Sequence, residues 1–138
     1  MSTSTTNLTV ADVLLPPEKI PVVTPTTLLK QTLEVMGEFR LGIASIVDDS
    51  GKLVGIFTDG DIRRMLLKDQ KPFPALFADD IIQHATKSPT TISPSATLVD
   101  AVAAMEDGEI WDLPVVSDNG TFVGLLHLHS AIKAVIEL

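Results

Sequence analysis

The sequence contains no cysteine and no tyrosine, and only one tryptophan and five phenylalanines. Without cysteine, disulfides, thiolate nucleophiles and thiolate metal ligands are excluded. The same absence is compatible with a reducing cytoplasm, where we expect the protein to reside. Because aromatic residues are scarce, the core must be built from Val, Ile, Leu and Ala. That composition favours β-strands packed against helices.

Long apolar runs and basic charge are also lacking. No run approaches the roughly 20 apolar residues that a membrane-spanning helix needs, and residues 1–9 do not have the pattern of a signal peptide. Ten basic residues against 18 acidic ones give a net charge of −8. Binding to nucleic acid or to an anionic membrane requires a basic face, so we expect neither partner. An anionic small molecule would need a few local donors.

The 138 residues fit one domain of ordinary size and contain an internal repeat. Pro25 and Pro94 are 69 positions apart (94 − 25), as are Gly55 and Gly124 (124 − 55). The register runs without a gap through Leu29 and Leu98, Met36 and Met105, Gly51 and Gly120, and Val54 and Val123. We therefore predict a flexible N-terminus (1–9), a first copy (10–68), a linker (69–76) and a second copy (77–138).

Each copy predicts the same order of elements. In the first copy, strands are expected at 20–23, 43–47 and 53–57, and helices from Leu29 to about Met36 and at 59–68. The second copy repeats this order at 90–92, 113–116 and 122–126 for the strands, and from Leu98 to about Met105 and at 128–136 for the helices. A short helical lead-in is expected at the start of each copy, because residues 78–82 resemble residues 11–15 at an offset of 67 (78 − 11).

A single unit of this size leaves one face of its small sheet uncovered. Pairing the two copies sheet to sheet buries that face. The expected fold is therefore mixed α/β (α+β), with two β-α-β-β-α repeats related by a pseudo-twofold axis. Equivalent segments from the two copies would line a cleft between them, and such junctions are common ligand sites.

The most informative stretch is residues 55–64, where a strand end, a tight turn and a helix start coincide. A helix N-terminus favours an anion such as phosphate. Thr58 can donate to a phosphate or sugar oxygen, and Asp61 is suited to accept from two ribose hydroxyls. Arg63 or Arg64 can reach a phosphate as a fork.

A simpler interpretation of these residues is structural. Asp59 or Asp61 would then cap the helix, and the arginines would be solvated. The second copy departs here, with His127 in the place of Thr58 and Ser130 in the place of Asp61. We therefore expect one asymmetric site, or two sites of different preference.

Two stretches resemble metal sites but are weak candidates. His127 and His129 are two positions apart at a strand end, which is a possible metal spacing. A pair that contacts a ligand, or that is satisfied within the protein, is the favoured interpretation. The acidic residues at 59–61 suggest a calcium loop, but Gln70 stands where that loop requires Glu. No metal is therefore expected.

The sequence has no recognisable catalytic set. A nucleophile elbow, a Walker phosphate loop and a dinucleotide fingerprint are all missing. His84 stands alone in the segment between the copies. Trp111 can stack on a base, although packing or a dimer contact is favoured. We therefore expect no catalysis by this chain.

The doubled unit, with its Gly-apolar-apolar-Thr-x-x-Asp ending, resembles the CBS domain pair, or Bateman module. The resemblance extends from about Val10 to Ile136. Residues 55–64 (GIFTDGDIRR) and 123–130 (VGLLHLHS) are similar to the C-terminal CBS pair of bacterial arabinose-5-phosphate isomerases, which make the precursor of Kdo. In that family a sugar-isomerase (SIS) domain carries the catalysis. Since this sequence lacks one, we expect a regulatory fragment or a stand-alone CBS protein.

The resemblance implies a regulatory nucleotide sensor that needs no other cofactor. The expected ligand is a cytidine or adenosine nucleotide, such as CMP, CMP-Kdo, AMP or ATP, bound in the cleft between the repeats. Thr58 and Asp61 match the family's phosphate and ribose positions, and Ser130 departs from the Asp usual in the second repeat. The full set of candidate nucleotide-binding residues is Thr58, Asp59, Asp61, Arg64, His127 and His129.

The resemblance also implies two protein partners. CBS pairs typically associate as homodimers, and the isomerases join the pair to the SIS domain. An alternative function is therefore a dimerisation or interaction module that binds no ligand. Isomerase activity of this chain alone is the least favoured hypothesis.

Overall fold

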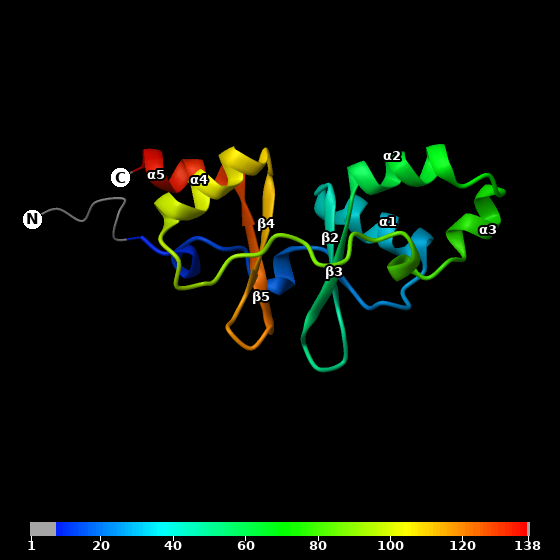
Figure 1. Ribbon diagram of the computed structural model, residues 1–138, viewed down its shortest axis with the longest axis horizontal. Helices are drawn as coiled ribbons and strands as arrows, with labels where there is room; N and C mark the ends of the chain where they lie inside the picture. Colours follow the sequence, from blue (N-terminus) through cyan, green and yellow to red (C-terminus); the bar gives the residue numbers. More distant parts are fainter. Residues whose placement is uncertain (1–7, 138) are drawn as a thin grey trace, which may run out of the picture. The chain divides into compact units, whose positions relative to one another are not determined.

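The structure, a computed structural model, describes residues 8–137 and divides into two compact units (Figure 1). The Asp61 unit comprises Glu18–Pro89, and among the described residues the His127 unit comprises 8–17 and 90–137. Each unit thus joins the core of one copy to the lead-in segment of the other. Most of the flexible terminus expected at 1–9 lies outside the described residues, but the Leu8 carbonyl accepts a hydrogen bond from the Leu98 amide (2.8 Å).

The Asp61 unit contains a three-stranded sheet in the order β1-β2-β3, with β1 parallel and β3 antiparallel to β2. Its elements are β1 (Val22–Val23), α1 (Leu29–Phe39), β2 (Ile43–Val47), β3 (Leu53–Thr58), α2 (Asp59–Lys68), α3 (Phe73–Phe77) and the 3₁₀ turn η4 (Ile81–Gln83). A further 3₁₀ turn, η3 (Pro17–Lys19), lies where the chain enters this unit.

The His127 unit contains a two-stranded antiparallel sheet, β4-β5. Its elements are η2 (Val10–Asp12), α4 (Leu98–Gly108), β4 (Asp112–Val116), β5 (Phe122–His127) and α5 (Leu128–Ile136). The predicted mixed α/β fold with two repeats is confirmed. Within residues 8–137, no helix combines the length and the apolar character needed to cross a membrane.

The first strand of the second copy is shorter than expected, and a proline explains the difference. In the Asp61 unit, the Ser45 amide in β2 donates to the Pro21 carbonyl (3.0 Å). Pro114 occupies the equivalent position in β4 and has no N–H to donate. The expected strand is therefore reduced to a single parallel bridge between Ile92 and Val115.

Each unit has its own apolar core, to which the lead-in contributes. The fully or almost fully buried side chains include Leu29, Met36, Ile46, Phe57 and Ile81 in the Asp61 unit, and Val10, Leu98, Met105, Val115 and Leu126 in the His127 unit. Helix residues predicted from their spacing, such as Leu29 and Met36, face these cores. Val10 and Ile81 come from the two lead-ins, so burial of one apolar side chain anchors each lead-in to its unit.

The lead-ins are equivalent at an offset of 71 (81 − 10), so the predicted offset of 67 is wrong. The Val10 amide donates to the Ala96 carbonyl (2.9 Å), and the Ile81 amide donates to the Thr27 carbonyl (2.8 Å). Ala96 and Thr27 are themselves equivalent positions of the repeat. Because backbone pairing and burial set this register, similarity of a short string of letters did not reveal it.

Each lead-in ends by pairing its backbone with the return strand. In the Asp61 unit, Ile56 and Thr86 exchange two hydrogen bonds (2.9 and 2.8 Å). In the His127 unit, Leu125 and Leu15 do the same (3.0 and 2.8 Å). The pairing therefore repeats with the sequence.

The repeated glycine in the return strand makes this close approach possible. A Cβ atom on Gly55 would lie 3.0 Å from the Thr86 carbonyl oxygen. A Cβ on Gly124 would overlap the Leu15 carbonyl oxygen, and the φ of Gly124 is 156°, which L-residues rarely adopt. The neighbouring backbone thus leaves no room for a Cβ on Gly124 and little room for one on Gly55.

Replacing Gly124 should loosen the His127 unit. We expect Gly124→Ala to lower the free energy of unfolding by roughly 1–3 kcal/mol, since the strand and the lead-in must separate. Gly37→Ala is the matched control, because a Cβ on Gly37 in α1 meets no atom within 4 Å. The control should raise stability by about 0.5–1 kcal/mol. Urea unfolding of both variants tests this, and a Gly124→Ala protein as stable as wild type would contradict it.

Candidate functional site

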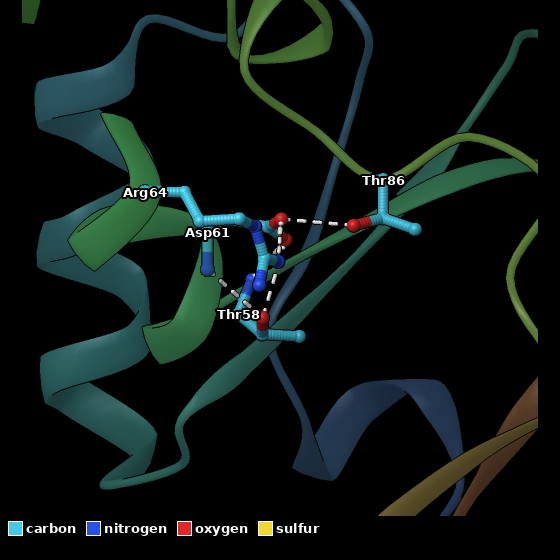
Figure 2. A network of polar contacts seen from close by, with 4 residues as sticks. All are labelled: Thr58, Asp61, Arg64 and Thr86. Carbon is cyan, nitrogen blue, oxygen red and sulfur yellow. Dashed lines mark hydrogen bonds and ion pairs between the residues drawn. The ribbon is translucent and has the colours of Figure 1, made fainter. Parts of the chain in front are cut away.

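The carboxylate of Asp61 lies at the centre of a polar network in the first turn of α2 (Figure 2). Its Oδ2 atom accepts hydrogen bonds from the amide (3.0 Å) and the hydroxyl (3.2 Å) of Thr58. In return, the Asp61 amide donates to Thr58 Oγ (3.3 Å), which completes a capping box. The Oδ2 atom of Asp61 therefore caps α2, as the structural interpretation of the sequence predicted.

The other oxygen, Oδ1, binds two side chains from further away. Arg64 Nη2 lies 2.5 Å from it, and the Thr86 hydroxyl donates to it at 2.8 Å (Figure 2). The Asp61 side chain is only 4% exposed. Burial of a carboxylate is costly unless it is hydrogen-bonded, and these donors offset that cost.

A pocket of about 730 Å³ opens beside this network, wholly within the Asp61 unit. Asp61, Arg64 and Thr86 line it together with Lys68, Lys71 and His84. Its volume falls in the range of small-molecule sites, roughly 300–1,000 Å³. Its lining brings together ammonium, guanidinium, carboxylate and hydroxyl groups, so it suits a polar and partly anionic ligand.

His84 lies in this lining between two carboxylates. Its Nδ1 atom is 3.3 Å from Asp69 Oδ2, and its Nε2 atom is 2.8 Å from Asp79 Oδ2. Lys71 Nζ also contacts Asp79 Oδ2, at 2.7 Å. The hydrogen bond from Lys71, and then the one from His84, lowers the pKa of the Asp79 carboxyl below its ordinary value of 3.8. The histidine that stood alone in the sequence therefore belongs to a charged cluster.

The structure separates the candidate residues of the first repeat. Thr58, Asp61 and Arg64 come together, whereas Asp59 faces a different pocket, of about 350 Å³. The Asp59 amide donates to the Gly42 carbonyl (3.1 Å), and its carboxylate lies where a Cβ on Gly42 would be. Of the two arginines considered, it is Arg64 that joins the network; Arg63 is exposed.

The candidate histidines lie in the His127 unit. His127 Nδ1 is 2.6 Å from Asp112 Oδ1, on the directly opposite residue of β4. The rings of His127 and His129 are 6.5 Å apart. Residues 8–137 contain no group of three or more His, Cys, Asp or Glu side chains placed to hold a metal ion.

The two units carry different groups at equivalent positions. His127, Ser130, Lys133 and Leu15 stand in the His127 unit where Thr58, Asp61, Arg64 and Thr86 stand in the Asp61 unit. Leucine has no donor and serine no carboxylate, so the network of the Asp61 unit has no counterpart built from these positions.

Sequence reasoning missed Thr86 and gave no role to His84. Thr86 is 25 positions from Asp61 and lies outside both predicted strands and helices. The one available signal was the repeated glycine, which marks where another backbone approaches. Trp111 is 71% exposed, so it does not serve the core; base stacking and a dimer contact stay predictions.

Removing the charge of Asp61 should destabilise the protein. Because Asn keeps only one acceptor oxygen, we expect Asp61→Asn to lower the free energy of unfolding by roughly 1–3 kcal/mol. Asp100→Asn is the control, since Asp100 holds the same position in α4 behind the N-cap Thr97 (3.1 Å) and its carboxylate is not buried. The control substitution should lower the free energy of unfolding by less than about 1 kcal/mol. Equal losses in urea unfolding would contradict a special role for the network.

The lowered pKa of Asp79 predicts a pH dependence. A carboxyl whose pKa is lower in the folded than in the unfolded state binds fewer protons when folded, so it contributes stability at neutral pH. That stability should be lost as the pH falls through the lowered pKa, below 3.8. We expect Asp79→Asn to melt below wild type at neutral pH, with the difference shrinking in acid. Asp80→Asn is the neighbouring control. If the difference in melting temperature between wild type and Asp79→Asn stayed constant with pH, it would contradict a stabilising role for the ionised Asp79 carboxylate.

The two copies match a known family. The CBS domain family matches residues 10–68 and 78–137. Among the similar curated proteins is the arabinose 5-phosphate isomerase KdsD of Yersinia pestis, 32% identical over 127 residues, which cover 92% of this chain and 37% of that protein. A probable arabinose 5-phosphate isomerase of Haemophilus influenzae is 37% identical over 112 residues, 81% of this chain and 32% of its own length. The chain thus spans about a third of the length of these relatives.

A solved structure agrees over nearly the whole chain. The CBSX2 protein in complex with AMP superposes with a TM-score of 0.83 at 27% identity, covering 95% of this chain and 98% of that one. The predicted resemblance to the CBS pair, and to the corresponding region of arabinose 5-phosphate isomerases, is confirmed. The chain therefore belongs to the CBS domain family and consists of a tandem CBS pair.

Proposed function

We propose that this CBS pair is a regulatory module that binds a nucleotide in the pocket of the Asp61 unit. The observation that carries the proposal is the buried Asp61 carboxylate, which lines a pocket of about 730 Å³ beside Arg64 and Thr86. A buried carboxylate is suited to accept hydrogen bonds from a ribose diol, and the cations are suited to a phosphate. The similarity to CBSX2, solved with AMP, supports the same ligand class.

Each side chain has a distinct proposed contact. Asp61 would accept from the ribose hydroxyls, while Thr58 and Thr86, whose hydroxyl protons bind Asp61, would offer acceptor oxygens. Arg64 and Lys68 would neutralise the phosphate; among the described residues, Lys68 forms no ion pair with an acidic side chain. No other cofactor is required. Asp59, His127 and His129 stay candidate contacts that neither the pocket nor the network includes.

Two comparisons bear on the base of the nucleotide, and they favour different bases. The similarity to KdsD favours a cytidine nucleotide such as CMP or CMP-Kdo, because Kdo synthesis ends in a cytidine sugar nucleotide. The AMP complex of CBSX2 favours an adenosine nucleotide such as AMP or ATP. We therefore propose all four as test ligands.

The proposed regulatory role concerns a longer parent protein. The relatives are about two and a half times as long as this chain, which leaves room for the SIS domain of an isomerase. A bound nucleotide would bias that domain only if its affinity differed between two states of the whole protein. In this proposal the CBS pair performs no chemistry, and the protein acts in the cytoplasm.

A dimerisation module is the second candidate function. Large apolar side chains are exposed on α2 and α3 at Leu66, Leu67 and Phe73, and on α5 at Ile132 and Ile136. Leu67 is 79% exposed and adjoins the exposed Leu66 on α2, and contiguous exposed apolar side chains mark interaction surfaces. A second copy of the chain would cover such residues in a homodimer.

Calorimetry and thermal shift with CMP, CMP-Kdo, AMP and ATP separate the two candidates. A nucleotide at about 100 times its dissociation constant should add roughly 2.7 kcal/mol of stability. Asp61→Asn should abolish this gain and Asp100→Asn should keep it, because only Asp61 lines the pocket. If none of the four ligands shifts the transition, while the protein assembles into dimers, the dimerisation module is correct and the nucleotide proposal is not.

A further inference from the structure

All acceptor positions of the Asp61 carboxylate are already in use. A carboxylate has about four lone-pair sites. Thr58 supplies two donors to Oδ2, and Arg64 and Thr86 supply one each to Oδ1 (Figure 2). A ligand hydroxyl can therefore bind this carboxylate only by displacing one of its present partners.

The four partners differ in how firmly they are held. The Thr58 contacts form the capping box, so their loss would uncap α2. Thr86 is held by two backbone hydrogen bonds to Ile56 (2.9 and 2.8 Å). Arg64 reaches Asp61 through a long side chain that is 62% exposed. The partner most easily displaced from Oδ1 is therefore Arg64.

The guanidinium also lies over the helix N-terminus. A Cβ on Gly60 would be 3.4 Å from Arg64 Nη1 and 3.6 Å from Thr58 Oγ. The side chain thus spans the positions where a hydroxyl would meet Asp61 and where an anion would meet the first turn of the helix. A small movement would take the guanidinium from one to the other.

We propose that Arg64 is an internal competitor for Asp61 that makes the pocket selective for phosphorylated ligands. This inference rests on the proposed nucleotide site and assigns a specificity-determining role within it. A hydroxyl that displaces Arg64 replaces a hydrogen bond between two charged groups by one in which only the carboxylate is charged, and it leaves the guanidinium without its carboxylate. A ligand that also carries a phosphate returns an anionic partner to Arg64, whereas a neutral nucleoside does not. The competition therefore lowers the affinity for nucleosides more than the affinity for nucleotides.

Arg63 provides a matched control on the same helix turn. It carries the same charge, it is exposed, and within residues 8–137 no hydrogen bond or ion pair links it to the network. Arg63→Gln and Arg64→Gln change the net charge equally, so a difference between them reports the contact with Asp61 and not the overall field.

The test compares a nucleoside with its 5′-monophosphate by calorimetry, using adenosine with AMP and cytidine with CMP. For wild type we expect the monophosphate to bind at least about tenfold more tightly than the nucleoside. In Arg64→Gln the nucleoside should bind more tightly by about threefold or more, and the monophosphate more weakly by about tenfold. The selectivity ratio should then approach one, while Arg63→Gln should keep the wild-type ratio.

Four outcomes would overturn the inference. Equal weakening of both ligands by Arg64→Gln would make Arg64 a positioning residue for Asp61. Affinities for both ligands that are unchanged from wild type would make it a solvated side chain. A nucleoside that loses affinity while the monophosphate keeps its affinity would remove the competition. Wild-type protein that binds neither ligand would remove the proposed function as well, whereas the first three outcomes leave that function standing.

A conservative variant covers the case in which Arg64→Gln folds poorly. Arg64→Lys keeps the charge but loses the planar fork. We expect it to melt close to wild type and to show a selectivity ratio between those of wild type and one. A ratio for Arg64→Lys equal to that of wild type would also contradict a role for the guanidinium in the competition.

Discussion

The pair of backbone hydrogen bonds between Ile56 and Thr86 supports both the Asp61 unit and its pocket. It anchors the segment after η4 to β3, and it places the Thr86 hydroxyl 2.8 Å from the Asp61 carboxylate. Gly55 permits the approach, because a Cβ there would crowd the Thr86 carbonyl at 3.0 Å. Since the paired segment belongs to the second copy in sequence, the bonds also make the Asp61 unit a composite of both copies.

The two units share their backbone pairing but differ in the side chains around the pocket. The same backbone pairing recurs between Leu125 and Leu15, where Gly124 again leaves room. Backbone bonds accept almost any side chain, so the polar Thr86 of one unit is an apolar leucine in the other. The duplication therefore preserved the glycines and the core while the groups around the pocket diverged. Asp61 is limited further, because one of its oxygens caps α2 and the other faces Arg64 and Thr86.

Much of the fold could be predicted, and the failures have physical causes. Periodicity located the helices and strands, because a half-buried element repeats its apolar residues at 3.6 or 2 positions. The strand expected at 90–92 is reduced to a single bridge, and the sequence did not reveal this because the loss depends on Pro114 in the neighbouring strand. The lead-in register was missed because Val10 and Ile81 become equivalent only through burial and backbone pairing. His84 was left without a role because its partners, Asp69 and Asp79, meet it only after the chain has folded.

The sequence by itself determined the duplication, the mixed α/β repeat, the family, and the grouping of Thr58 with Asp61. These features depend on residues close together in the chain or on a regular repeat, and a helix turn brings positions three apart into contact. Tertiary structure alone decided that Thr86 completes the network, that Asp59 faces elsewhere, and that Arg64 and not Arg63 holds the carboxylate. Those contacts depend on the direction of each side chain and on a strand pairing across 30 positions (86 − 56), neither of which local spacing contains.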